Sequence, residues 1–208
     1  MASSARSEQS SRRRGEMLQA YYATLRETGL QEASIGRIAK RLGLHPSLFI
    51  HYFGTKEQMT IELVDYLLEE FRQTYLNKLS AISDPSDRLL AILDAWFSVP
   101  YQEMVDDKVY YACFYLSLHH PRLEEAFATL SEEETDLVES TIAECMAKGR
   151  IPDGSPRDLA LGVKALEAGF AFLIASGKEA GIKQRVGDTL KEQALRLLGV
   201  AQESAISC

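Results

Sequence analysis

The chain has 208 residues, of which 46% are apolar, and it carries a formal net charge of −7. This length allows one compact helical body with a small attached domain, and no stretch resembles a signal peptide or a membrane span, so we expect a cytoplasmic protein. Its three cysteines, Cys113, Cys145 and Cys208, have no Cys-x-x-Cys spacing. That pattern indicates neither a disulfide framework nor a zinc site.

The charge is divided unevenly along the chain. Residues 1–56 hold nine Lys and Arg against four Asp and Glu, a net charge of +5, whereas residues 57–208 hold 14 against 26, a net charge of −12. This division of charge is expected where a basic domain contacts phosphate groups and the acidic remainder of the protein is repelled by them.

The first 11 residues are small and polar and show no apolar periodicity, so we expect a disordered arm. Arg12, Arg13 and Arg14 follow directly, and on a flexible arm they could reach a minor groove of DNA. The alternative is a solvated tail. A first helix is predicted over residues 14–28, ending at Gly29.

Residues 34–56 read as two short helices joined by a tight turn. Ser34 is a plausible N-cap, and the first helix then has apolar residues at Ile35, Ile38, Ala39 and Leu42, which fall on one helical face. Gly43 suits the left-handed residue that ends a helix, and the second helix can restart with His45 as N-cap and Pro46 at its first position. The exposed side of this second helix is then expected to carry Ser47, Ile50, His51 and Tyr52.

This helix-turn-helix resembles the DNA-binding domain of the TetR family of bacterial transcriptional regulators. The matching residues are Ser34, Ile38, Ala39, Gly43, Phe49, Tyr52, Phe53 and Lys56. Ile50 departs from the family pattern, which usually has a tyrosine there that can reach a DNA phosphate. The resemblance implies a three-helix DNA-binding domain over residues 12–56.

Candidate DNA contacts follow from the basic residues, the exposed helix face and this resemblance. They are Arg12, Arg13, Arg14, Ser34, Arg37, His45, Ser47, Leu48, His51, Tyr52 and Lys56. Among them, His51 is expected to meet a base edge and Tyr52 a phosphate. Lys56 falls in the first turn of the next helix, where a cation is unfavourable for the helix dipole unless a phosphate is nearby.

After Thr55 a long helix is predicted to about residue 79, with two apolar stripes, joining the DNA-binding domain to the body. Proline and glycine then mark further helices over 85–99, 101–119, 121–148, 156–176 and 182–198, and no strand is predicted. The expected fold is therefore all-α, with residues 57–208 forming a larger helical ligand-binding and dimerisation domain.

The predicted helix over 156–176 is apolar nearly all round, so it must be covered on both sides. A second copy of the chain is the most economical cover, which predicts a homodimer through the last two helices. The TetR resemblance implies the same arrangement.

No motif for catalysis is found. There is no His-Glu-x-x-His, no Gly-x-Ser-x-Gly and no glycine-rich phosphate loop, so we expect neither an enzyme, nor a cofactor, nor a metal site. His119 and His120 adjoin Pro121 at a helix end, where the expected role is hydrogen bonding to that end. Binding a ligand or sensing pH is the alternative for one of them.

Aromatic residues concentrate in the predicted body. The candidate ligand-binding residues are Trp96, Phe97, Tyr111, Phe114, Tyr115 and Phe170, because buried tyrosine hydroxyls need partners and suit the wall of a pocket. Ordinary core packing is the alternative for each. The nearby acidic residues Asp94, Glu103, Asp106, Asp107 and Glu167 could attract a cationic ligand, or could be surface charges and ion pairs.

The expected function is that of a homodimeric, sequence-specific DNA-binding transcriptional regulator, a repressor released from its operator DNA by an unknown small-molecule effector. The alternative from another class is a helical ligand-binding or adaptor protein whose basic segment meets a protein partner. No membrane partner is expected.

Overall fold

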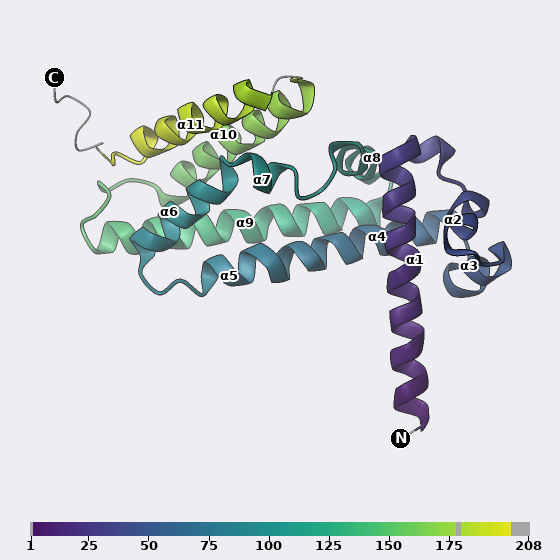
Figure 1. Ribbon diagram of the computed structural model, residues 1–208. Helices are drawn as coiled ribbons and strands as arrows, with labels where there is room; N and C mark the ends of the chain where they lie inside the picture. The colour runs from purple at the N-terminus through teal and green to yellow at the C-terminus, as the bar shows by residue number, and fades with distance from the viewer. Residues whose placement is uncertain (1, 178–179, 201–208) are drawn as a thin grey trace. The chain divides into compact units, whose positions relative to one another are not determined.

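The computed structural model describes the backbone of residues 2–177 and 180–200, and the side chains of residues 8–177 and 182–200. Every regular element in these ranges is a helix, which confirms the expected all-α class (Figure 1). The chain divides into two compact units, Met1–Phe71 with Val105–Ala128, and Arg72–Met104 with Thr129–Cys208.

The first unit is built around its N-terminal helix. Its helices are α1 (Ala2–Glu32), α2 (Ile35–Leu42), α3 (Pro46–Phe53), α4 (Lys56–Phe71) and α8 (Asp107–Ser117). Helix α1 packs against α2, α4 and α8. The side chains of Met17, Tyr21, Ile38, Phe49 and Met59 are almost completely buried and form the core of this unit.

Helix α1 begins earlier than expected. Residues 2–11 are helical, where we expected a disordered arm, and Met1 lies outside the described residues. No proline or glycine interrupts residues 2–14, and Arg12 pairs with Glu16 one turn later, so the helix can extend without a core. The side chains of residues 8–11 are all exposed. At its other end, α1 is kinked at Gly29, whose φ of 77° lies in the region that favours glycine.

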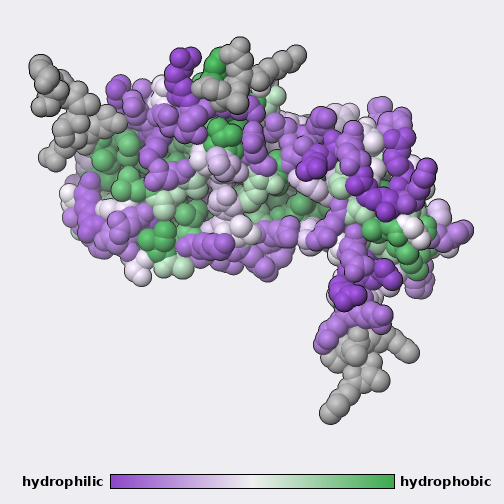
Figure 2. Space-filling view, in the orientation of Figure 1, coloured by the Kyte–Doolittle hydropathy of each residue, from purple (hydrophilic) through white to green (hydrophobic). Residues whose placement is uncertain are grey.

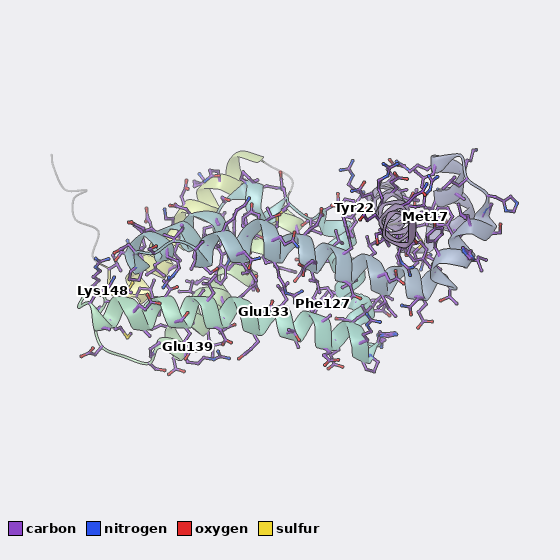
Figure 3. All side chains as sticks on the ribbon, turned by 90° about the horizontal axis from the view of Figure 1, so that it is seen from below. Met17, Tyr22, Phe127, Glu133, Glu139 and Lys148 are labelled. Atoms are coloured by element: carbon purple, nitrogen blue, oxygen red, sulfur yellow. The ribbon has the colours of Figure 1, made fainter. Side chains whose placement is uncertain are left out.

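Helix α8 belongs to the first unit, although the sequence suggested that everything after residue 56 forms the body. Its buried residues Val109, Cys113 and Ser117 recur every four positions, and α8 packs against α1. Tyr22 lies on α1 (Figure 3). Its hydroxyl accepts a hydrogen bond from the backbone N–H of Asp106, 3.0 Å away. The compact unit around the helix-turn-helix is therefore larger than residues 12–56.

The second unit holds the remaining helices. They are the π-helical turn η1 (Arg72–Leu76), α5 (Asn77–Ser80), α6 (Pro85–Trp96), α7 (Val99–Gln102), α10 (Pro156–Ser176) and α11 (Ala180–Leu197), with most of α9 (Pro121–Ala147), which begins in the first unit. The long helix expected over residues 55–79 is present, but η1 interrupts it with wider turns. Glu133 lies on α9 (Figure 3) and accepts a hydrogen bond from Nε of Arg72 of η1 at 2.6 Å.

Two expected boundaries were wrong. Pro100 does not end the preceding helix, because α6 already stops at Trp96 and Pro100 lies at the start of α7, where its missing N–H costs no helical hydrogen bond. The helix expected over 101–119 is split, and Asp106 caps α8 by accepting a hydrogen bond from the backbone N–H of Lys108 at 3.0 Å.

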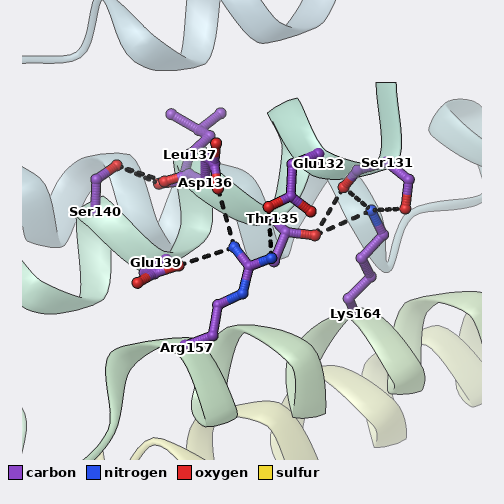
Figure 4. A network of polar contacts seen from close by, with 9 residues as sticks. All are labelled: Ser131, Glu132, Thr135, Asp136, Leu137, Glu139, Ser140, Arg157 and Lys164. Carbon is purple, nitrogen blue, oxygen red and sulfur yellow. Dashed lines mark hydrogen bonds and ion pairs between the residues drawn. The ribbon is translucent and has the colours of Figure 1, made fainter. Parts of the chain in front are cut away.

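Basic side chains of α10 bind the acidic face of α9 (Figure 4). The Arg157 guanidinium contacts the carboxylates of Glu132, Asp136 and Glu139 at 2.6–2.9 Å. One heptad further along α10, Lys164 lies 3.1 Å from the Glu134 carboxylate. These contacts fix α10 on α9 through polar groups.

The other side of α10 is apolar and exposed. Phe172 is 64% exposed and Leu173 50%. By length and composition alone, α10 could cross a membrane, with a mean hydropathy of 1.6 and 22% of its most apolar window buried. This corrects the expectation that no stretch resembles a membrane span, and the cause is that apolar residues occupy nearly the whole circumference of this helix.

Candidate nucleic-acid interface

The turn between α2 and α3 is fixed by local hydrogen bonds. Ser34 Oγ accepts from the backbone N–H of Arg37 at 3.3 Å, so Ser34 is the N-cap of α2. Gly43 ends α2 with a φ of 64°, and the N–H of Leu44 donates back to the carbonyl of Ala39 at 2.9 Å. The sequence predicted the N-cap at Ser34 and the left-handed Gly43, and the connection between the two helices has only three residues.

Helix α3 starts as expected. The ring Nδ1 of His45 accepts from the backbone N–H of Ser47 at 3.3 Å and lies 2.7 Å from the Ser47 hydroxyl. Pro46 occupies the first turn. On the inner side, Phe49 and Phe53 are 1% and 4% exposed, so they anchor α3 in the core of the first unit.

The outer side of α3 is open to solvent. Ser47, Ile50 and His51 are exposed, whereas Leu48 and Tyr52 are half-buried. Figure 2 shows hydrophobic surface at the end of the unit where α2 and α3 lie, and Ile50 is 55% exposed there. The Tyr52 ring meets the His51 ring edge-on, with the two centroids 5.7 Å apart. A hydroxyl and an imidazole are thus presented beside an apolar side chain.

Several basic side chains of the same unit pair with solvent-accessible carboxylates. Arg12 and Arg13 share Glu16, at 3.5 and 3.2 Å, and Arg37 lies 3.2 Å from Glu32. Exposed ion pairs contribute little, about 0–1 kcal/mol each, so these arginines can exchange a carboxylate for a phosphate at small cost.

Two other candidate DNA contacts already have partners inside the unit. Arg14 binds both carboxylate oxygens of Glu62 at 2.6 Å. Lys56 donates from Nζ to the carbonyl of Leu30 at 2.8 Å, and its partial burial lowers its pKa from the ordinary value. The sequence missed Glu62 and Leu30 as partners, because they lie 48 and 26 residues away and no local pattern reports such pairs.

The candidate ligand-binding residues fall into two groups. Trp96, Phe97 and Phe170 belong to the second unit and are at most 2% exposed, and the rings of Phe97 and Phe170 lie 6.3 Å apart. Tyr111, Phe114 and Tyr115 belong to the first unit and are exposed on α8. Neither unit by itself brings all six together, so one common pocket stays a prediction.

A polar cluster lies beside the buried aromatic group of the second unit. Gln102 donates from Nε2 to the carbonyl of Trp96 at 2.9 Å and to Glu167 at 2.7 Å. Burial raises the pKa of Glu167 to about 7, with the nearby Glu134 carboxylate also raising it and the Lys164 ammonium lowering it. In the described structure the Glu167 carboxyl group has one hydrogen bond, from the Gln102 amide.

The other acidic residues near the aromatic set have structural roles. Asp94 pairs with Lys191, Glu103 lies 3.1 Å from Lys183, and Asp106 caps α8. Among the residues that the structure describes, no three His, Cys, Asp or Glu side chains are grouped to hold a metal ion.

His120 lies at the start of α9, where its carbonyl accepts from the backbone N–H groups of Leu123 and Glu124 at 2.9 and 3.0 Å. Its ring Nε2 lies 3.6 Å from the Glu57 carboxylate, and its ring Nδ1 is buried without a hydrogen-bond partner. His119 contacts the Tyr115 ring edge-on. The His120 contacts at the start of α9 are made by its backbone, so capping of a helix end by a histidine side chain stays a prediction.

Comparison with known families matches both parts of the chain. Residues 18–63 match the family described as bacterial regulatory proteins, tetR family, and residues 84–200 match the tetracyclin repressor-like C-terminal domain. The regulator BetI from Yersinia pestis (strain Pestoides F) is 33% identical over 113 residues, which is 53% of this chain and 57% of that protein. The chain therefore matches little more than half the length of this curated relative.

Solved structures share the fold. A TetR transcription regulator from Haloarcula marismortui has a TM-score of 0.78 at 20% identity, covering 91% of this chain and 97% of that one. A transcriptional regulator from Saccharomonospora viridis, solved in complex with choline, has a TM-score of 0.77 at 18% identity, covering 88% and 95%. Together with the two family matches, these findings confirm the resemblance seen in residues 34–56. The chain belongs to the TetR family of bacterial regulatory proteins.

Proposed function

We propose that the protein is a cytoplasmic repressor that reads operator DNA with α3 and leaves it when a small molecule binds. The observation that carries the proposal is the two-sided character of α3, which buries Phe49 and Phe53 and presents Ser47 and His51 outward. A helix anchored in this way can enter the major groove, with His51 at a base edge.

Other residues of the same unit would position the helix on the backbone of the duplex. Phosphate contacts carry little sequence information but fix register and orientation. The proposed contacts besides His51 are Arg12, Arg13, Ser34, Arg37, His45, Ser47, Leu48, Tyr52 and Lys56. At Ile50 the apolar side chain can only make a non-polar contact, for example with a thymine methyl group.

The proposed operator-binding form is a homodimer through α10 and α11. Exposed residues of α10 recur along one stripe, at Leu161, Ala165, Ala168, Gly169 and Phe172. Their spacing of three and four positions is that of a single helical face, and the small residues in its middle allow a second helix to approach closely. Figure 2 shows hydrophobic surface along the α11 edge of the second unit, and Ile182 and Leu197 of α11 are each 44% exposed.

A dimer explains how two short recognition helices can bind one site. Their half-sites would be centred about 34–36 Å apart, one turn of B-DNA, and the site would be an inverted repeat. An effector that binds better when this spacing is lost would release the operator by its differential affinity for the two arrangements.

The proposed effector site lies in the second unit, at the buried Trp96, Phe97 and Phe170, with Tyr111, Phe114 and Tyr115 of α8 kept as further candidates. A cationic effector is a second candidate. It is favoured because Glu167 lies beside this aromatic group, joined to it through Gln102, and has that single amide as its hydrogen-bond partner. Aromatic faces and a carboxylate together suit a quaternary ammonium group. The Saccharomonospora viridis neighbour with bound choline is in keeping with this candidate.

A gel-shift experiment tests the proposal. Genomic fragments are incubated with the protein in excess non-specific DNA, with and without choline as the first effector probe. The proposal expects retardation of a small set of fragments that share an inverted repeat. If no fragment is retained and the protein instead co-purifies with a protein partner through its basic segment, residues 1–56, the adaptor alternative takes the place of the repressor.

A further inference from the structure

Arg14 joins three helices of the first unit at one point. Its Nε and one terminal nitrogen donate to the two carboxylate oxygens of Glu62, each at 2.6 Å, which ties α1 to α4. The carbon at the centre of the same guanidinium lies 4.9 Å from the centroid of the Phe53 ring. Phe53 is the last residue of α3, so the recognition helix ends against this ion pair.

The geometry favours a strong and well-defined contact. A two-point arginine–carboxylate pair fixes direction as well as distance, and a guanidinium over an aromatic face adds a further attraction. The side chain of Glu62 is only 20% exposed and that of Arg14 is 39% exposed. The hydrogen bonds to Glu62 are also the largest cause of the raised pKa of Arg14.

Neighbouring contacts hold the same pair of helices but not the end of α3. The hydroxyls of Tyr21 and Thr60 lie 2.8 Å apart in the core between α1 and α4. Gln19 donates to the hydroxyl of Tyr66 at 3.2 Å. Among these side-chain contacts, only Arg14 also touches α3, so it links the end of the recognition helix to both α1 and α4.

We propose that Arg14 is a positioning residue for operator binding, which orients α3 through Glu62 and Phe53, and that it is not a phosphate contact. This inference rests on the proposed reading of DNA by α3. It also assigns Glu62 a role in DNA binding, although the charge of this carboxylate by itself would be repelled by the DNA phosphates.

For Glu62→Gln, a positioning role and a simple effect of net charge predict opposite changes in the affinity for operator DNA. Removing a negative charge from a DNA-binding unit should strengthen operator binding if only the net charge matters. If Glu62 holds Arg14 in place, the same substitution should weaken operator binding about tenfold, because α3 loses its fixed angle. Glu57→Gln is the matched control, since Glu57 lies in the first turn of the same helix, is 75% exposed and makes no contact with Arg14. It should bind operator as tightly as the wild type, or more tightly.

The salt dependence of operator binding distinguishes a positioning role of Arg14 from a direct contact between Arg14 and a DNA phosphate. Affinities are measured by fluorescence anisotropy on an operator fragment at several salt concentrations, with each variant first shown to be folded by circular dichroism. Arg14→Gln should weaken binding at every salt concentration and leave the slope of log K against log salt unchanged. Loss of one phosphate contact per protomer would instead reduce the slope by roughly 0.9 for each protomer. If Arg14→Gln does not fold, Arg14→Lys, which keeps the charge and loses the two-point contact, is measured in its place.

The results of these experiments distinguish a failure of the positioning role of Arg14 from a failure of the proposed function. Wild-type protein that selects no operator contradicts the proposed function. Wild-type protein that binds an operator, together with a Glu62→Gln variant that binds it at least as tightly, overturns only the positioning role of Arg14. A reduced salt slope in the Arg14 variant overturns it as well.

Discussion

The ammonium group of Lys56 lies 2.8 Å from the carbonyl oxygen of Leu30, so the first residue of α4 holds the end of α1 just beyond its kink at Gly29. The lysine has three N–H donors and this bond uses one, which leaves two for a phosphate. The same side chain can therefore join the helices and contact DNA.

Lys56→Gln should reduce the salt slope of operator binding, because one phosphate contact per protomer is lost, by about 0.9 for each. It should also lower the free energy of unfolding by roughly 1–3 kcal/mol, since a hydrogen bond from a charged donor is lost. The measurements are anisotropy titrations across salt and urea unfolding. A slope equal to that of the wild type would mean that Lys56 serves only the contact with Leu30.

Stability should fall as pH rises through the pKa of Glu167. Burial raises this pKa from 4.5 to about 7, so the folded state binds the proton more tightly than the unfolded state. The stabilisation is fully present below the unfolded pKa and is lost as pH rises toward and through about 7. At about 1.4 kcal/mol per unit of pKa, the difference between 4.5 and about 7 amounts to at most about 3.5 kcal/mol.

Urea unfolding at pH 5 and pH 8 measures this effect. The wild type should lose more stability between the two values than Glu167→Gln, because only the wild type carries this carboxyl group. Glu124→Gln, at an exposed position on α9, is the control and should behave like the wild type. Equal pH dependence in wild type and Glu167→Gln would show that Glu167 is hydrated in solution.

Gly187 of α11 lies directly against the backbone of the α6–α7 connection. A Cβ at this position would collide with the carbonyl oxygen of Phe97 and lie 3.0 Å from Cζ of Phe170. Gly187→Ala should therefore lower the free energy of unfolding by about 1–3 kcal/mol. In Gly15→Ala the new Cβ meets nothing within 4 Å, and this control should be neutral or stabilising by up to about 1 kcal/mol. Equal stability of both variants would contradict this packing.

The α10 stripe should carry the dimer. Phe172, which is 64% exposed in the single chain, lies in this stripe, so Phe172→Glu would place two charges in an apolar interface and should give monomers. Leu90→Glu, at a 44% exposed position on α6, should leave the dimer intact. Sedimentation velocity distinguishes the two species. A Phe172→Glu variant that stays dimeric would exclude this face of α10 as the dimer interface.

Local rules were enough to predict the helix-turn-helix. Ser34, Gly43 and His45 make the capping contacts that their residue types indicate, because these contacts join positions at most a few residues apart. The apolar positions of α2 were less certain, since Ile38 is fully buried but Leu42 at the end of the same stripe is 36% exposed. A face predicted by periodicity is buried only where a neighbouring helix covers it.

Long-range pairs and the assignment of helices to units could not be predicted from the sequence. Nothing near Arg14 indicates that Glu62 will meet it, and nothing in α8 indicates that Val109 and Cys113 will face α1. The candidate ligand residues could not be sorted by burial from the sequence either. Aromatic composition identified Trp96 and Tyr115 alike, although Trp96 is buried and Tyr115 is 59% exposed.

The central claim is that a dimer of this chain reads a specific DNA sequence through α3. Sequencing the genomic fragments selected by the wild type and by His51→Ala tests it most directly, with His119→Ala as a control for loss of an exposed histidine. We predict that the wild type and the His119 variant select the same inverted repeat, with half-sites about one helical turn apart, and that His51→Ala selects an altered half-site. Fragments without a common sequence, or an identical repeat bound equally well by His51→Ala, would contradict the claim.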